Sequence, residues 1–214
     1  MKYRSVQRLR KSFPLFSLFA DAAKSYLAMI HYLQAYSLTL RSADEKREYL
    51  RYWQRTTGFE VFIETGTYQG RTALQMAKVF CKCFTIELDP KLYAQANERF
   101  AGVDNITSFL GDSALHLPSI LAQIHQPAVF WLDAHDSGSH TARGTKDTPI
   151  ARELAMIFAH EVKNHVILID DARTFCGIFG YPSIRQLHRF VLDNSGYYMH
   201  ISQDVIAIHP YEFD

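Results

Sequence analysis

From residue 59 onward, short apolar runs alternate with segments of helical spacing, and this alternation most constrains the fold. Five of the runs are typical of buried strands, and a helical pattern lies between successive runs. Connections of that length favour parallel pairing, with helices on both faces of the sheet. The predicted strands are FEVFIET (59–65), CFTIEL (83–88), NITSFLGD (105–112), AVFWLDAH (128–135) and HVILIDDA (165–172).

The end of the chain has a different pattern. After a helical segment at 181–195, two apolar runs at 197–202 and 205–209 are separated only by Gln203 and Asp204. So short a connection predicts an antiparallel hairpin added to the sheet. We therefore predict a doubly wound α/β fold, with a mostly parallel seven-stranded sheet in residues 58–214 and a helical extension in residues 1–57.

The N-terminal region is both basic and apolar. Its first five basic residues precede the first acid, Asp21, although the formal net charge of the whole chain is only +1; they are Lys2, Arg4, Arg8, Arg10 and Lys11. That balance gives no reason to expect nucleic acid as a partner. Apolar residues from 19 to 33 recur at intervals of three and four, which predicts one face of a helix. Three interpretations of this helix are open. It packs on the domain or on a second copy of the chain, it contacts a membrane surface peripherally through residues 1–40, or it is a cleaved signal.

The three cysteines, Cys81, Cys83 and Cys176, show no paired spacing. This argues against a zinc site or a disulfide framework and indicates a reducing compartment. We therefore expect small core cysteines in a cytoplasmic protein. Asp21 and Lys24 interrupt the apolar N-terminal run, so no span of about 20 apolar residues is present there.

The segment FIETGTYQGRT (62–72) places an acid and two glycines where the first predicted strand meets a helix. In open α/β sheets, ligands bind beyond the carboxyl ends of the strands. Gly66 and Gly70 permit a tight turn and a close approach of the backbone. Tyr68 replaces the second glycine of a dinucleotide-binding loop, and no Gly-Lys-Ser/Thr follows, so neither a dinucleotide nor a Walker site is indicated.

An acidic loop without a phosphate-binding lysine favours a nucleoside that carries positive charge, such as S-adenosylmethionine. Glu64 would attract the cationic amino acid end, and Glu87 would accept hydrogen bonds from both ribose hydroxyls. Asp112 and Ser113, after the third strand, would lie beside the adenine. The predicted cofactor-binding residues are Glu64, Gly66, Thr67, Tyr68, Gly70, Glu87, Asp112 and Ser113.

Each of the three acids also has a plain structural interpretation. Glu64 can be a solvated strand end, Glu87 an acid that precedes a helix, and Asp112 the N-cap of the following helix. The cofactor interpretation differs from these because it explains three strand ends at once.

The segments FIETGTYQGRT, TIELDP and FLGDSALHLPSIL resemble the cofactor motifs of the class I S-adenosylmethionine-dependent methyltransferases. The E-x-G-x-Y-x-G form is similar to that of catechol O-methyltransferase and its metal-dependent relatives, and macrocin-type sugar O-methyltransferases share the acid-rich strand ends. The resemblance covers residues 58 to about 210. It implies an enzyme that methylates a hydroxyl of a small molecule or sugar.

The resemblance also implies a metal site. The metal-dependent relatives use an aspartate after the fourth strand and an acid pair, or an acid and an amide, after the fifth; Asp133, Asp170 and Asp171 stand at the matching places. Three carboxylates suit Mg²⁺, which would lower the pKa of the acceptor hydroxyl. Because neighbours in a strand point to opposite faces, Asp170 and Asp171 can share an ion only where the chain already turns.

Asp136 replaces the catalytic lysine of catechol O-methyltransferase, which weakens catechol as the substrate. His135 is our candidate general base, and we predict that it acts together with Asp133; Lys146 is the second choice. The polar segment 136–149, with Arg143, is either a substrate loop or a solvated surface loop.

Two other functions stay open. One is a methyltransferase-like protein that binds the nucleoside without transferring a methyl group and is recruited through its N-terminal helix. The other is an enzyme of this fold that transfers a different group.

Overall fold

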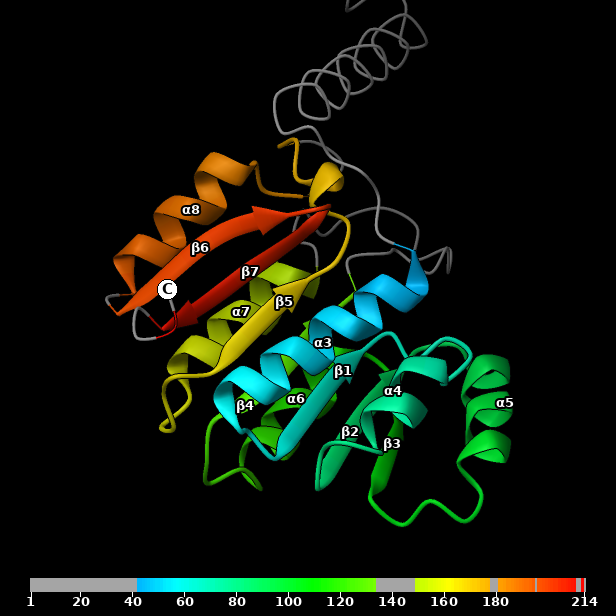
Figure 1. Ribbon diagram of the computed structural model, residues 1–214. Helices are drawn as coiled ribbons and strands as arrows, with labels where there is room; N and C mark the ends of the chain where they lie inside the picture. Colours follow the sequence, from blue (N-terminus) through cyan, green and yellow to red (C-terminus); the bar gives the residue numbers. More distant parts are fainter. Residues whose placement is uncertain (1–41, 134–148, 178–180, 195, 211–212, 214) are drawn as a thin grey trace, which may run out of the picture. The chain divides into compact units, whose positions relative to one another are not determined.

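The computed structural model describes residues 42–133, 149–177, 181–194, 196–210 and 213 (Figure 1). The chain divides into two compact units, Met1–Leu38 and Thr39–Asp214, and every described residue belongs to the second. The predicted N-terminal helix and its three interpretations therefore lie outside the described residues.

The described residues form one seven-stranded sheet in the order β3-β2-β1-β4-β5-β7-β6. Strands β1 to β5 pair in parallel, and β7 pairs antiparallel with both β5 and β6. The predicted mostly parallel sheet with an antiparallel C-terminal hairpin is thus confirmed. The strands are β1 Val61–Thr65, β2 Lys82–Glu87, β3 Ile106–Leu110, β4 Ala128–Leu132, β5 Val166–Ile169, β6 Tyr197–Ser202 and β7 Val205–Pro210.

The helices begin where the sequence has capping signals. Asp89 caps α5 with Pro90 at the first position, and Ser183 caps α8 through a capping box with Gln186. Figure 1 shows α3 and α4 over one face of the sheet and α6 and α7 behind it. The helices are α3 Ala43–Thr57, α4 Arg71–Met76, α5 Pro90–Phe100, α6 Ser113–Leu121, α7 Pro149–Ala159 and α8 Ile184–Asp193, with a short 3₁₀ turn, η1, at Ala172–Thr174.

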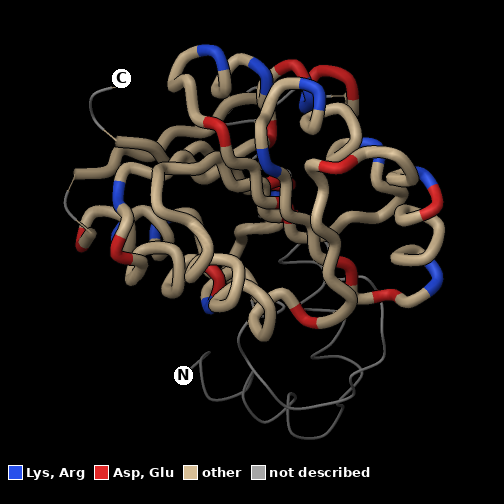
Figure 2. Tube along the Cα trace, turned by 90° about the horizontal axis from the view of Figure 1, so that it is seen from below, with Lys and Arg blue, Asp and Glu red and all other residues tan. Residues whose placement is uncertain are grey.

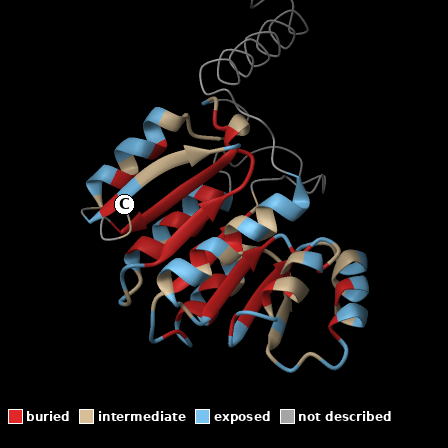
Figure 3. Cartoon of the chain, in the orientation of Figure 1, coloured by how far each residue is buried: buried red, intermediate tan, exposed pale blue. Residues whose placement is uncertain are grey.

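The centre of the sheet is buried on both faces. Every residue of β1, β4, β5 and β7 is buried, whereas the outer strands β3 and β6 are mostly half-buried (Figure 3). Helices on both faces explain why the central strands are continuous apolar runs rather than alternating ones. The edge that matters for function is therefore the one where the parallel strands end.

Helix α3 is part of this domain. Its N-terminus is held by a capping box in which Ser42 and Glu45 each accept a backbone hydrogen bond from the other. Its Leu50 and Trp53 are buried in the same core cluster as Phe62 of β1. The predicted boundary between residues 57 and 58 therefore falls inside the compact unit, because the apolar face of α3 covers the sheet.

Charged residues of both signs are interspersed along the described chain (Figure 2). No helix in this part of the chain is long and apolar enough to cross a membrane. All three cysteines are free; Cys83 is buried as predicted, whereas Cys81 is exposed and Cys176 is only half-buried.

Candidate functional site

The strand register brings the predicted site residues to one edge of the sheet. The sheet order reverses at β1, which pairs with β2 on one side and β4 on the other. The hydrogen-bond ladder continues one residue past the strands, since Asp133 N donates to Thr65 O (3.2 Å) and Asp170 N to Leu132 O (2.9 Å). Asp133 thus stands beside the end of β1, at the switch point where open α/β sheets bind ligands, and Asp170 stands one strand further on, beside the end of β4.

The loop after β1 is folded tightly onto β2. Gly66 N and Thr67 N both donate to Ile86 O, at 2.9 and 3.1 Å. Gly66 has φ +85°, and a Cβ there would lie 2.8 Å from Asp133 Cβ and 3.1 Å from Asp133 Oδ2. The predicted need for glycine is confirmed, and its cause is the approach of Asp133, whose carboxylate faces this loop.

The second glycine of the loop serves packing. Gly70 has φ +70°, and a Cβ there would lie 2.8 Å from the ring of Phe100 and 3.1 Å from Ala96 Cβ. These two residues belong to α5, so Gly70 lets α5 pack against the start of α4. Between the glycines, Tyr68 has φ 49° and a side chain that is 60% exposed.

Glu64 is buried, so its interpretation as a solvated strand end is wrong. Its Oε2 accepts a hydrogen bond from Thr85 Oγ1 at 2.8 Å, and Thr85 in turn contacts Thr67 Oγ1 at 2.6 Å. Burial, together with the charges of Asp133 and Glu87, raises the pKa of Glu64 to about 8, against the opposing influence of the Thr85 hydrogen bond. The three carboxylates therefore act on one another in a single site, and a cation placed there would favour ionised Glu64.

Glu87 connects two loops. Its Oε2 accepts a hydrogen bond from Tyr68 N (2.6 Å), and its Oε1 accepts one from Asp89 N (2.9 Å). Because Asp89 is the N-cap of α5, Glu87 also has the predicted role of an acid that precedes a helix. Each carboxylate oxygen keeps a second lone pair for another donor. Glu87 therefore fixes the first loop in place and can still accept hydrogen bonds from a ligand.

At the end of β3, Asp112 is the N-cap of α6 and accepts from Ala114 N at 2.8 Å. Arg152 NH2 lies 3.9 Å from Asp112 Oδ2, and both side chains are well exposed. The capping interpretation of Asp112 is thus confirmed, and it leaves Ser113 as the first residue of α6, with its hydroxyl hydrogen-bonded to Glu153.

Glu153 of α7 is buried, and it is not among the site residues predicted from the sequence. Burial raises the pKa of Glu153 to about 7, against the opposing influence of the Ser113 and Thr65 hydroxyls. The signal was present, because Glu153 occupies a position of helical spacing between the buried residues Ile150 and Ile157. An acid on the apolar face of a helix beside a predicted cofactor site is therefore a feature to look for.

The acids after β5 have cationic partners within the chain. Strand β5 ends at Ile169, and Asp171 has φ 56°, so the chain already turns here, as a shared ion would require. Lys46 Nζ of α3 lies 2.6 Å from Asp170 Oδ2 and 3.9 Å from Asp171 Oδ1. Burial raises the pKa of Asp170 to about 6; Asp171 adds to this, and Lys46 opposes it.

A second cation completes this cluster. Arg173 NH1 lies 2.7 Å from Asp171 Oδ1 and also pairs with Asp204 Oδ2 in the turn between β6 and β7. Burial lowers the pKa of Arg173, but Asp171 and Asp204 outweigh burial and raise it above its ordinary value. We call Lys46, Asp170, Asp171, Arg173 and Asp204 the β5 charge cluster.

These contacts do not fit the expected magnesium site. Mg²⁺ requires oxygen lone pairs at about 2.1 Å in near-octahedral geometry. Asp170 already accepts Lys46 and the backbone N–H of Asp171, and Asp133 faces the first loop instead. No three His, Cys, Asp or Glu side chains among the described residues converge to hold a metal ion. The predicted general base, His135, and the alternatives Lys146 and Arg143 lie outside the described residues.

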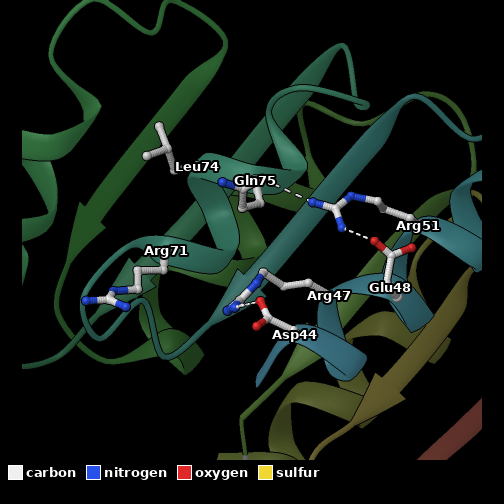
Figure 4. A pocket seen from close by; sticks show the side chains of 7 residues that line it. All are labelled: Asp44, Arg47, Glu48, Arg51, Arg71, Leu74 and Gln75. Carbon is white, nitrogen blue, oxygen red and sulfur yellow. Dashed lines mark hydrogen bonds and ion pairs between the residues drawn. The ribbon is translucent and has the colours of Figure 1, made fainter. Parts of the chain in front are cut away.

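A separate groove of about 460 Å³ opens between α3 and α4 (Figure 4). Arg47 and Arg51 of α3 pair with acids three residues earlier in the same helix, and Arg51 also donates to Gln75 at 3.1 Å. This groove contains none of the predicted site residues. It is lined by Asp44, Arg47, Glu48, Arg51, Arg71, Leu74 and Gln75.

Several solved methyltransferases have a fold similar to that of this chain. The O-methyltransferase TomG from Streptomyces achromogenes, in complex with SAM, superposes with a TM-score of 0.58 at 16% identity over 89% of this chain and 95% of that chain. A putative caffeoyl-CoA O-methyltransferase from Staphylococcus aureus gives 0.58 at 13% identity, over 92% and 96%. An O-methyltransferase from Bacillus cereus, in complex with SAH, gives 0.55 at 13% identity, over 87% and 90%. The chain has the methyltransferase fold.

No protein-family model matches the chain, and no curated protein matches it. The similarity to the solved methyltransferases nevertheless confirms the fold that the sequence resemblance implies. At these identities, activity has to be argued from the site itself.

Proposed function

We propose that this protein binds S-adenosylmethionine at the carboxyl ends of β1, β2 and β3 and transfers its methyl group to a hydroxyl of a small molecule or sugar. One observation carries the proposal: Glu64 and Glu87 are buried at the switch point, and neither forms an ion pair with a described residue. Buried acids without a counter-ion are costly unless a ligand supplies positive charge. The cofactor supplies a methyl group on a cationic sulfonium.

The residues at this edge have distinct roles in the proposal. Glu87 accepts the ribose hydroxyls through its remaining lone pairs, while its two backbone hydrogen bonds keep the carboxylate oriented. Glu64, buried at the end of β1, balances the positive charge of the cofactor. Gly66 has no side chain, so Asp133 can approach the loop closely. Asp112, by capping α6, orients Ser113 toward the adenine.

Methyl transfer forms a carbon–oxygen bond at the acceptor and breaks the carbon–sulfur bond of the cofactor. The sulfonium becomes a neutral thioether, and the acceptor hydroxyl loses its proton to a base, for which His135 is our candidate. The main contribution of the protein is to hold donor and acceptor in line. Divalent-metal assistance is left out of this proposal, because Lys46 and Arg173 occupy the acids expected to hold the ion.

Calorimetry with S-adenosylmethionine tests the cofactor site. We expect stoichiometric binding that Glu87→Gln weakens and Glu60→Gln does not, since Glu60 is an exposed acid just before the start of β1. Absence of binding by the wild-type protein would overturn the proposal.

Transfer is tested separately. Cofactor with a radiolabelled methyl group is incubated with phenols and sugars, and label on an acceptor oxygen is the expected result. Binding without label on any acceptor would support the alternative of a nucleoside-binding protein.

A further inference from the structure

Three carboxylate oxygens of the β5 acids already face a backbone donor or a cation of the chain. Asp170 Oδ1 accepts the backbone N–H of Asp171 at 2.8 Å, and Asp170 Oδ2 accepts Lys46 Nζ at 2.6 Å. Asp171 Oδ1 faces Arg173 NH1 at 2.7 Å. Lys46 is also 3.9 Å from that same oxygen, so its ammonium lies between the two acids.

The ammonium of Lys46 is in the place that a shared divalent ion would need. An ion within bonding distance of both Asp170 Oδ2 and Asp171 Oδ1 would be within a few ångströms of Nζ. Like charges at so short a distance repel one another strongly at the effective dielectric of a protein surface. Lys46 would have to leave before such an ion could bind.

Lys46 is positioned by the fold and not by chance contact at the surface. It lies in the first turn of α3, directly after the capping-box residue Glu45. One to two turns later, Leu50 and Trp53 anchor the same helix in the core of the sheet. The Lys46 side chain is only 22% exposed, and that of Asp170 is 9% exposed.

We propose that Lys46 is a built-in cation that takes the place of a divalent metal at the end of β5, so that this protein binds its cofactor and transfers methyl without such an ion. Lys46 acts as a positioning residue, because it holds the Asp170 carboxylate at the end of β5 rather than touching a substrate. The part that concerns methyl transfer rests on the proposed function, whereas the part that concerns ion binding does not.

Manganese binding, followed by the loss of the free Mn²⁺ signal in electron paramagnetic resonance, tests the ion-binding part. We expect no Mn²⁺ site at the acid pair of the wild-type protein. Lys46→Gln should bind Mn²⁺ about tenfold or more tightly than the wild type, because the acids lose their competing cation. Lys46→Arg keeps the charge and should behave as the wild type, and adding Asp170→Asn to Lys46→Gln should abolish the new site.

Two results would overturn the inference. One is a Mn²⁺ site in the wild-type protein that Asp170→Asn removes; the other is a folded Lys46→Gln protein with no gain in Mn²⁺ affinity. If Lys46→Gln does not fold, the wild-type titration still decides, since a site there contradicts the inference and its absence together with full methyl transfer in EDTA supports it. Cofactor affinity in EDTA is measured in parallel, so failure of the proposed function is seen as loss of that binding alone.

Discussion

The two halves of the same sheet edge treat their buried acids in opposite ways. Among the described residues, Glu64 and Glu87 at β1 and β2 accept hydrogen bonds only from a hydroxyl and from backbone N–H groups. At β5, Asp170 and Asp171 are compensated by the full positive charges of Lys46 and Arg173. The first half therefore contains buried carboxyls that no described cation compensates, whereas the acids of the second half are neutralised by the chain itself.

This difference shows that an acid at a strand end is not by itself evidence of a ligand site. What separates the two halves is whether a cation arrives from elsewhere in the chain. Only the acids to which no described residue brings a cation are suited to a cationic cofactor, and we call this difference the division between the two halves.

The largest effect is expected in the neutralised half. Asp204→Asn leaves Arg173 with one acidic partner instead of two, and it keeps a residue that tolerates the left-handed backbone at φ 68°. We expect a loss of about 2–3 kcal/mol in the free energy of unfolding, near the lower limit for buried pairs because Arg173 is partly exposed. Urea denaturation measures it, with the exposed Asp193→Asn as control. Weakened cofactor binding without destabilisation would contradict the division.

Glu87→Gln tests the other half. The amide cannot accept both backbone N–H groups and the ribose, so we expect cofactor affinity to fall by about 30-fold, or roughly 2 kcal/mol. Calorimetry measures the affinity, and urea denaturation should show a smaller change in stability than for Asp204→Asn. If both variants lost cofactor binding equally, the two halves would not differ as stated.

Gly66→Ala tests the closeness of the first loop to Asp133. Gly102→Ala is a matched control, because Gly102 also has positive φ (+79°) but a Cβ there meets nothing within 4 Å. Both variants pay for the strained backbone, and Gly66→Ala should lose about 2 kcal/mol more, because its Cβ would collide with Asp133. Equal losses of unfolding free energy for the two variants in urea denaturation would show that Asp133 does not approach Gly66 closely.

The raised pKa of Glu64, about 8, predicts a pH dependence of stability. The folded state holds this proton and the unfolded state releases it near its ordinary pKa of 4.5, so stability is lost as pH rises from there through about 8. The slope is at most about 1.4 kcal/mol per pH unit. Glu64→Gln should flatten it, as seen in unfolding free energies of the cofactor-free protein at several pH values. A slope unchanged by the substitution would show that Glu64 ionises normally.

The smallest effect concerns Glu153, whose pKa is about 7. Below the ordinary pKa of 4.5 both states hold the proton and the carboxyl resembles an amide, so Glu153→Gln should change stability by under about 0.5 kcal/mol. As pH rises from there to about 7, the unfolded state releases the proton and the folded state keeps it, so the wild-type protein loses at most about 1.4 kcal/mol per pH unit and the variant should become the more stable. The exposed Glu161→Gln should show no such crossover in melting temperature.

Much of the architecture could be predicted from the sequence. The strand runs, the N-caps at Asp89 and Asp112, and the two-residue turn at Gln203 and Asp204 all depend on residues close together in the chain. The tight turn after β1 was predictable for the same reason, because its two glycines lie within a few positions of one another.

The pairing of charges could not be predicted in this way. Lys46 and Asp170 are 124 positions apart in the chain, and Arg173 and Asp204 are 31 apart. Nothing in the sequence near Asp170 indicates that a lysine from the first helix of the domain will reach it. Helix α3 itself was assigned to an extension, because its contribution to the core is visible only when it lies on the sheet.

The sequence alone determined that this chain forms a parallel sheet with acids after its strands, since periodicity and capping are local properties of the chain. Only the tertiary structure decided which of these acids are neutralised and which are left for a ligand. The reason is physical: the ionic state of a buried carboxylate depends on the charges and the solvent around it, and folding sets both by bringing distant side chains together.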